Sequence, residues 1–239
     1  MGRLILVRHA QASFLSENYD QLSALGETQA RLLGEYWARR NVVFSRVCTG
    51  PAIRHQQTAR IAGEAYCKFG LQFPAPSIRE EFDEFQGEAV LSQSLPQLCT
   101  NNGRIRELHD AVQSSNSESD KRAAFQRMFE AVISMWVDGE TAPQNVESWQ
   151  EFCARVRRGL ITFLANSGKG ELVAIFSSGG PLGVAVQHAL HLSAQDTLRV
   201  AWMSRNCSFS EFLFSGDRLT LSSFNSFPHL DDDSLLTYR

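Results

Sequence analysis

The sequence predicts an α/β fold: a three-layer αβα sandwich around a mostly parallel sheet, with an inserted helical cap and a C-terminal hairpin. The first observation is a set of short apolar runs, clearest at residues 4–7 and 172–176, which are typical of buried parallel strands. The second is that helical segments separate these runs, and strands that alternate with helices favour βαβ units. The length of 239 residues fits a single domain, residues 1–239, with the cap at residues 88–140.

The composition is that of an ordinary globular protein and excludes several classes of partner. The chain is 43% hydrophobic and 21% charged, with a formal net charge of −3. No overall basic field attracts nucleic acid or anionic lipid, so we expect neither partner. The first apolar run is far shorter than the roughly 20 residues of a membrane span, and we expect no signal peptide. Five widely spaced cysteines without a C-x-x-C pair indicate a reducing, cytoplasmic location.

The N-terminal apolar run is predicted to be a strand. It ends directly on Arg8 and His9. Ligands of open α/β sheets bind just beyond the carboxyl ends of such strands, so both side chains are expected where chemistry takes place. Ser23 is a suitable N-cap for the amphipathic helix that follows.

A second strand is expected at residues 42–48. The turn after it leads into a helix, with Pro51 tolerated at the first helical position. Arg54 falls in the first turn of this helix, where backbone N–H groups also favour an anion. Arg54 is therefore a second cation expected at the carboxyl end of a strand.

An acidic cluster and a helical insertion follow. The prolines at 74 and 76 break the pattern, and the acids come directly after them: Glu80, Glu81, Asp83 and Glu84. Helical patterns then fill the cap, most clearly at residues 121–137, where apolar side chains share one face. We expect the insertion to cover the sheet edge as a lid.

The last third of the chain returns to alternating helices and strands. Residues 147–164 form a predicted amphipathic helix, and the strand at 172–176 leads into a helix that runs through Leu192. The segments 208–214 and 219–224 alternate like strands around a Ser-Gly-Asp turn, which predicts a hairpin.

Three predicted strand ends thus carry polar groups. They hold Arg8 with His9, then Arg54, and finally Ser178 with Gly179. A nucleophilic imidazole flanked by two permanent cations suits a phosphoryl group. A lone histidine at a strand end is more often structural than catalytic, but the order and type of the three features together favour a site.

Five segments carry further motifs. They are Leu6-Val7-Arg8-His9, LSALGETQA at residues 22–30, GPAIRHQQTA at 50–59, Glu147-Ser148-Trp149 with Phe152 and Arg155-Val156, and the closing Asn206-Cys207-Ser208, Asn225 and His229-Leu230. Together they resemble the histidine phosphatase superfamily, the phosphoglycerate-mutase-like fold. The resemblance spans nearly the whole chain apart from the cap.

The resemblance implies a mechanism. His9 would attack a phosphoryl group and become phosphohistidine. Arg8 and Arg54 would bind the phosphoryl oxygens and neutralise the charge that develops on them. Glu81 would protonate the leaving group and later activate water, whereas another alignment of the acidic cluster gives that role to Glu80.

Two positions depart from the pattern of the family. Ala10 replaces the usual glycine after the histidine. Ser178 stands where most members have a second histidine, which resembles a branch of the family with serine there; Ser178 and Gly179 would then bind the substrate. Loss of a preorganised donor typically costs about 10²–10³ in rate. Either the substrate needs less help, another group fills in, or the protein is a weak or inactive relative.

The predicted function is metal-independent hydrolysis of a phosphomonoester, on a small phosphorylated molecule or a phosphopeptide. The alternatives are a phosphoglycerate-mutase-type phosphotransferase and a catalytically weak protein that binds phosphorylated ligands. No cofactor is expected. His188 and His191 stand three positions apart but lack a further ligand at metal-site spacing, so no metal is expected there. His55 is expected to support Arg54 or to face solvent.

Overall fold

The structure is a computed structural model that describes residues 1–13, 20–165, 167–168 and 170–238. The chain divides into two compact units. The sheet unit comprises Met1–Glu84 and Ala154–Arg239, and the helical unit comprises Phe85–Cys153. Each unit is described by itself.

The sheet unit is built on a six-stranded sheet with the order β3-β2-β4-β1-β5-β6. The strands are β1 (Gly2–Arg8), β2 (Arg46–Thr49), β3 (Ser77–Ile78), β4 (Leu172–Ser177), β5 (Phe209–Ser215) and β6 (Arg218–Ser226). Pairings among β1 to β4 are parallel, whereas β1–β5 and β5–β6 are antiparallel. The mostly parallel sheet and the closing hairpin confirm the fold class predicted from the sequence.

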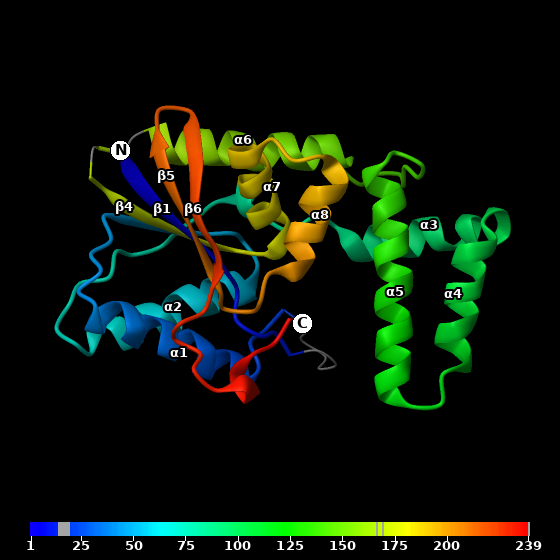
Figure 1. The fold of residues 1–239 in the computed structure, drawn as a ribbon, viewed down its shortest axis with the longest axis horizontal. Coiled ribbons are helices and arrows are strands. Elements are labelled where there is room, and N and C mark those ends of the chain that lie inside the picture. The colour runs from blue at the N-terminus through cyan, green and yellow to red at the C-terminus, as the bar shows by residue number, and fades with distance from the viewer. Residues whose placement is uncertain (14–19, 166, 169, 239) are drawn as a thin grey trace. The chain divides into compact units, whose positions relative to one another are not determined.

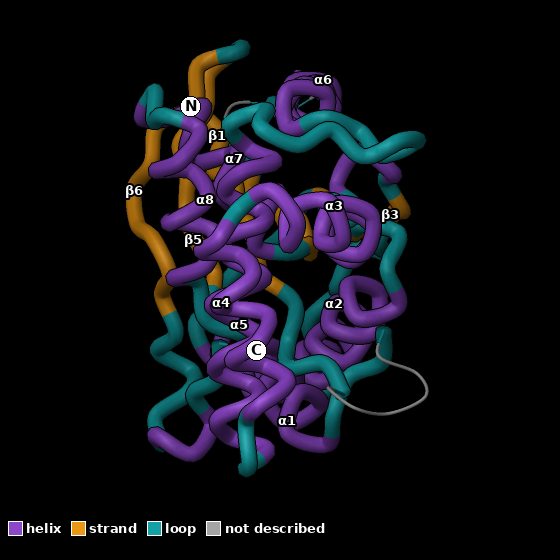
Figure 2. The backbone as a smooth tube through the Cα atoms, turned by 90° about the vertical axis from the view of Figure 1, so that its right-hand side faces the viewer, coloured by secondary structure: helices purple, strands orange, loops and turns teal. Residues whose placement is uncertain are grey.

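Helices cover both faces of this sheet (Figure 1). They are α1 (Ala24–Arg39), α2 (Ile53–Cys67), α6 (Trp149–Ala165, which begins in the helical unit), α7 (Gly179–Leu190) and α8 (Ala194–Met203). α1 and α2 lie side by side on one face, and α6 and α7 lie on the other (Figure 1, Figure 2). At Gly34 of α1 any Cβ would collide with the Ala62 carbonyl of α2, so this glycine allows the close packing of the two helices.

The predicted strand at residues 42–48 begins later than expected, at Arg46. Two hydrogen bonds fix Val42 outside the sheet, because its N–H donates to the Trp37 carbonyl at 3.1 Å and its carbonyl accepts from the Tyr66 hydroxyl at 2.6 Å. The backbone of Val42 is therefore bonded to α1 and α2 instead of continuing the strand.

The helix after β4 ends before the predicted Leu192. His191 adopts the left-handed conformation with φ of 57°, which stops α7 at Leu190. Ser193 then accepts a hydrogen bond from Asp196 N at 3.1 Å and caps α8, a helix that the sequence analysis did not predict. By contrast, the predicted N-cap Ser23 is confirmed, since its Oγ accepts from Gly26 N at 3.0 Å.

The helical unit contains α3 (Gly87–Asn101), α4 (Gly103–Ser114) and α5 (Glu118–Val137). A cluster of aromatic rings closes one end of it: Phe85, Trp136, Trp149 and Phe152. These contacts explain why the compact unit is wider than the predicted cap at residues 88–140. That the helical unit acts as a lid stays a prediction. None of the described helices has both the length and the apolar character that crossing a bilayer requires.

Candidate active site

His9 lies immediately beyond the carboxyl end of β1, as predicted. Its N–H donates to the Ser177 carbonyl at 2.7 Å, at the end of the neighbouring strand β4. Its carbonyl accepts from Cys207 N at 3.1 Å and from the Asn206 side chain at 3.3 Å. The backbone of His9 is thus bonded on one side to the end of β4 and on the other to the segment that precedes β5.

The imidazole of His9 has a defined tautomer. Its Nδ1 lies 2.8 Å from the Ala10 carbonyl, which can only accept, so Nδ1 carries the proton and Nε2 keeps its lone pair. Ala10 itself is held by a hydrogen bond from its N–H to Thr58 Oγ1 of α2, at 3.1 Å. Burial, followed by the positive charges of Arg54 and Arg8, keeps the pKa of His9 well below its ordinary value. The ring is therefore neutral and nucleophilic at neutral pH.

Both predicted arginines lie near His9, and their positive charges, that of Arg54 before that of Arg8, help to lower the pKa of its ring. Arg8, the last residue of β1, is buried, and its Nη1 donates to the Ser204 carbonyl. Arg54 lies in the first turn of α2, where its Nη1 forms an ion pair with Asp20 Oδ1 at 2.6 Å. Such a pair of cations is suited to the oxygens of a phosphoryl group.

Ser178 occupies the N-cap position of α7, but its side chain makes no capping bond. Its Oγ lies instead 2.6 Å from His55 Nε2 and 3.5 Å from Arg54 Nη2. The following residue, Gly179, is packed against α8, since any Cβ there would lie 2.9 Å from the Ala201 carbonyl. The structure thus brings Ser178 to the predicted arginine, and its contact with His55 is a feature that sequence analysis missed.

His55 does not face solvent, contrary to one of the two sequence-based expectations. Its side chain is completely buried, and its ring centroid lies 5.7 Å from that of His9. Burial, and then the charge of Arg54, hold the pKa of His55 well below its ordinary value. In the sequence, only the position of His55 directly after Arg54 indicated that it belongs to the site, because its contact with Ser178 spans 123 positions.

The acidic cluster separates into carboxylates with different surroundings. Glu84 Oε2 accepts a hydrogen bond from Gly180 N at 3.0 Å, in the first turn of α7 and two residues after Ser178. Glu81, the predicted acid, packs its Cβ against Gly159 of α6, where any side chain at 159 would collide with it. Glu80 is exposed. The sequence analysis gave Glu84 no role, and it missed the contact of this side chain with Gly180.

The sequence model of the histidine phosphatase superfamily (branch 1) matches residues 4–89 and 102–226 of the chain. The chain belongs to the histidine phosphatase superfamily. The family resemblance deduced from the motifs is therefore confirmed, whereas its assignment to a branch with serine at position 178 stays a prediction. No curated protein sequence is significantly similar to the chain.

Solved structures support the histidine phosphatase fold. The chain is similar to a mycobacterial glucosyl-3-phosphoglycerate phosphatase, with a TM-score of 0.62 and 18% identity over 95% of this chain and 99% of that one. It is also similar to a putative α-ribazole-5′-P phosphatase of Escherichia coli, with a TM-score of 0.62 and 19% identity over 94% and 96%. A third is a phosphoserine phosphatase of Entamoeba histolytica, with a TM-score of 0.61 and 16% identity over 96% and 100%.

Several of the histidine phosphatase motif residues hold the site together rather than face it. Gln29 Oε1 accepts from Gln11 N, and Gln57 Oε1 accepts from Leu22 N, both at 2.8 Å. Arg155 Nη1 lies within 3.1–3.2 Å of three carbonyl oxygens in the acidic segment, those of Glu80, Glu81 and Asp83. These contacts fix the backbone of the segment after β1 and of the acidic segment.

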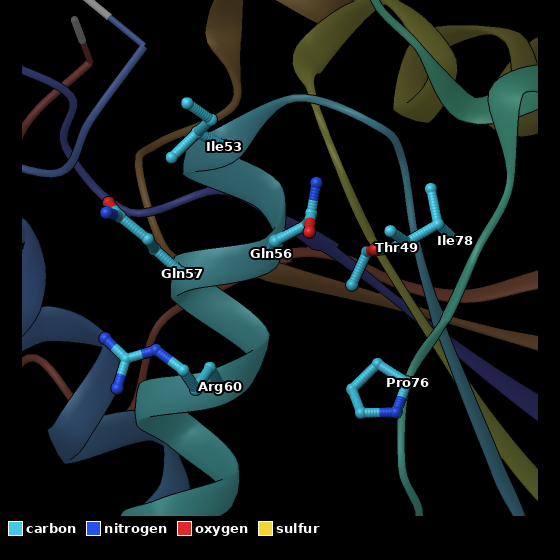
Figure 3. A pocket seen from close by; sticks show the side chains of 7 residues that line it. All are labelled: Thr49, Ile53, Gln56, Gln57, Arg60, Pro76 and Ile78. Atoms are coloured by element: carbon cyan, nitrogen blue, oxygen red, sulfur yellow. The ribbon is translucent and has the colours of Figure 1, made fainter. Parts of the chain in front are cut away.

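A cleft of about 400 Å³ runs along α2 (Figure 3). Its lining residues are Thr49, Ile53, Gln56, Gln57, Arg60, Pro76 and Ile78. The helical residues among them follow the spacing of one helix face, which differs from the face that carries Arg54 and His55. The lining of this cleft therefore includes neither Arg54 nor His55.

No group of three or more His, Cys, Asp or Glu side chains in the described ranges is arranged to hold a metal ion. Of the pair considered in the sequence, His188 contacts the Asp217 carbonyl through Nε2 at 3.1 Å, and His191 ends α7. All five cysteines are free thiols, and Cys48, Cys153 and Cys207 are buried.

Proposed function

We propose that the protein hydrolyses phosphomonoesters through a phosphohistidine formed on His9 Nε2. The observation that carries this proposal is the state of His9: a neutral ring with its lone pair on Nε2, subject to the charges of Arg8 and Arg54. A neutral imidazole is a competent nucleophile, and the two guanidinium groups neutralise the equatorial phosphoryl oxygens during transfer.

The reaction has two balanced steps. In the first, Nε2 forms a bond to phosphorus while the bond from phosphorus to the ester oxygen breaks, and a carboxylic acid gives the leaving oxygen its proton. In the second, the resulting carboxylate takes a proton from water, whose oxygen bonds to phosphorus as the N–P bond breaks. Inorganic phosphate leaves, and both His9 and the acid return to their initial states.

Three carboxylates are candidates for the role of the acid: Glu84, Glu81 and Glu80. Glu81 is the residue that the family resemblance implies. The contacts of the structure favour Glu84, because its Oε2 touches the backbone of Gly180 beside Ser178, whereas the Cβ of Glu81 packs against Gly159 of α6. We therefore propose Glu84 as the proton donor and keep Glu81 as the alternative to be tested beside it.

The substrate that we propose is a small phosphorylated molecule. The proteins with similar structures are named for α-ribazole-5′-P, glucosyl-3-phosphoglycerate and phosphoserine, which supports small phosphomonoesters over phosphopeptides. We further propose that neither a metal nor a cofactor takes part, and that the protein acts in the cytoplasm, where its five free thiols stay reduced.

The experiment that tests this function is trapping of the intermediate. The wild-type protein is mixed with a phosphomonoester, quenched in alkali, and digested, and the phosphoryl adduct is located by mass spectrometry. We expect it on His9, with turnover abolished in His9→Ala and retained in the control His188→Ala. Turnover of the His9→Ala variant at the wild-type rate would refute the mechanism.

The trapping experiment, with a phosphorylated acceptor added, separates hydrolysis from the two alternative functions. A phosphotransferase would pass the phosphoryl group from His9 to this acceptor faster than to water. A binding protein would retain phosphate affinity with neither an adduct nor turnover.

A further inference from the structure

Ser178 has a buried partner that the proposed mechanism does not use. His55, in the first turn of α2, places its Nε2 2.6 Å from Ser178 Oγ. The ring is completely buried and lies 5.7 Å, centroid to centroid, from the ring of His9. A buried polar pair so close to the nucleophile belongs to the same site.

The protons of this pair can be placed by counting donors and acceptors. Burial keeps the pKa of His55 low, so the ring is neutral and carries one N–H. Its Nδ1 is buried and has no hydrogen-bond partner among the described residues. A proton on Nδ1 would be a buried donor without an acceptor, whereas a proton on Nε2 is donated to Ser178 Oγ. The proton therefore resides on Nε2.

This placement determines the direction of the serine hydroxyl. The Oγ of Ser178 accepts from His55 Nε2 at 2.6 Å and from Arg54 Nη2 at 3.5 Å. With both contacts made by donors, the hydroxyl proton of Ser178 is left without an acceptor within the described part of the chain. It is directed away from both donors and is available to an anion.

The local backbone is shaped around this histidine. Any Cβ at Gly50, in the turn between β2 and α2, would collide with His55 Nδ1 and with the Phe82 carbonyl. Ser177, directly before Ser178, donates its hydroxyl to the same Phe82 carbonyl at 2.6 Å. The turn before α2 and the end of β4 thus enclose the imidazole and the hydroxyl together.

We infer that His55 is a positioning residue that orients the Ser178 hydroxyl as the third donor to the phosphoryl oxygens, beside Arg8 and Arg54. This inference rests on the proposed function, because it concerns the same phosphoryl group. It explains how the site works with serine at position 178: an imidazole from α2 acts through a hydroxyl, rather than on the phosphoryl group itself.

The test is a double-mutant cycle with His55→Phe, which keeps a ring but removes the donor, and Ser178→Ala. For Ser178→Ala we expect kcat on phenyl phosphate to fall about 100-fold, as for other lost oxyanion donors. For His55→Phe we expect a fall of about tenfold or more. The double variant should be no slower than Ser178→Ala within about twofold, because His55 acts only through the hydroxyl.

Two further variants separate positioning from folding. His55→Gln, whose amide can place a donor near the position of Nε2, should recover most of the activity lost in His55→Phe. His229→Phe replaces another buried histidine of the sheet unit and should leave kcat unchanged. If His55→Phe does not fold, His55→Leu, which also lacks the donor, carries the test in the wild-type and Ser178→Ala backgrounds, with a rate loss expected only in the former. Additive losses, or a change in Tm alone, would overturn the inference.

Binding of orthovanadate, measured by calorimetry on the same variants, makes the inference independent of turnover. Its affinity should fall in Ser178→Ala and His55→Phe and recover in His55→Gln. If the wild-type protein binds vanadate with this pattern but hydrolyses nothing, the proposed function fails while the positioning of Ser178 stands. If the wild-type protein turns over substrate and the pattern is absent, the inference fails alone.

Discussion

Asp20 holds Arg54 at the N-terminus of α2. One carboxylate oxygen pairs with Arg54 Nη1 at 2.6 Å, and the other accepts from Ile53 N at 2.7 Å. The N-cap residue of α2, Ala52, has no side chain to accept a hydrogen bond, so Asp20 supplies this acceptor from a distant part of the sequence. The same carboxylate therefore caps the helix and orients the guanidinium that faces the site.

Asp20→Ala should reduce kcat/KM for a phosphomonoester about tenfold, because Arg54 loses the partner that fixes its orientation. Glu64→Ala is the matched control, since Glu64 forms an exposed ion pair with Arg60 of the same helix at 2.7 Å. Steady-state kinetics should show a loss for the first variant and none for the second. An increase in activity for Asp20→Ala would show that Asp20 competes with the substrate for Arg54.

The loss of rate on replacement of the acid should depend on the leaving group of the substrate. An alkoxide needs a proton when it leaves, whereas a nitrophenolate hardly does. Glu84→Gln, which keeps an oxygen for Gly180 N, should slow an alkyl phosphate by on the order of 100-fold and nitrophenyl phosphate much less. Glu81→Gln is measured in parallel. If the selective loss belongs to Glu81→Gln, the assignment drawn from the family resemblance is right and the one drawn from the Gly180 contact is wrong. Glu80→Gln tests the other alignment of the acidic cluster, which gives the role of the acid to Glu80.

A histidine at position 178 should reduce activity. The space beside Ser178 is occupied by His55, whose Nε2 lies 2.6 Å from the hydroxyl, so Ser178→His places two imidazoles in one volume. Overpacking of this kind typically costs about 1–3 kcal/mol. The double variant Ser178→His/His55→Ser exchanges the two side chains and should recover part of the lost stability and turnover. A clear rise in kcat for Ser178→His alone would contradict this view of the pocket.

Chelation should leave the activity unchanged. Arg8 and Arg54 place two permanent cations at His9, and these can neutralise phosphoryl oxygens as a metal ion would. The measurement is phosphomonoester hydrolysis after treatment with a chelator and again after addition of divalent ions. A loss of activity on chelation that a divalent ion restores would contradict the proposed chemistry.

The protein should lose stability between pH 6.5 and pH 4. Burial lowers the pKa of His229 from 6.5 to about 4, so the unfolded chain binds a proton more readily than the folded one in this range. The contribution of His229 to the free energy of unfolding is complete above pH 6.5 and is lost as the pH falls towards 4. At about 1.4 kcal/mol for each pKa unit, the loss is about 3 kcal/mol. The pKa values of His9 and His55 are lowered in the folded protein as well.

Urea unfolding from pH 7.5 to pH 4 measures this effect. His229→Phe keeps an aromatic ring beside Phe209, on which the imidazole stacks at 6.1 Å between centroids. This variant should lose less unfolding free energy on acidification than the wild-type protein. An identical pH dependence in the two proteins would show that His229 does not titrate with folding.

Local patterns were sufficient to predict most of the scaffold. Apolar runs predicted β1 and β4, because strands buried on both faces have no polar side chains. Helical periodicity predicted α1 and the helix α5 of the helical unit, and the hydroxyl of Ser23 predicted where α1 begins. The boundary of β2 could not be predicted, because a hydrogen bond to the distant Tyr66 decides it. The helix α8 was missed although Ser193 is a local N-cap signal for it.

The sequence by itself determined the chemical composition of the site: a histidine and an arginine at the end of one strand, a second arginine at the start of a helix, and a serine at the start of another. These residues are recognisable because each lies next to a local signal, the end of an apolar run or the start of a helix. Only the tertiary structure decided their partners. The contact between His55 and Ser178 spans 123 positions, and that between Glu84 and Gly180 spans 96. A hydrogen bond between such distant side chains leaves no periodic pattern, and it forms only when parallel strands bring their carboxyl ends to one edge of the sheet.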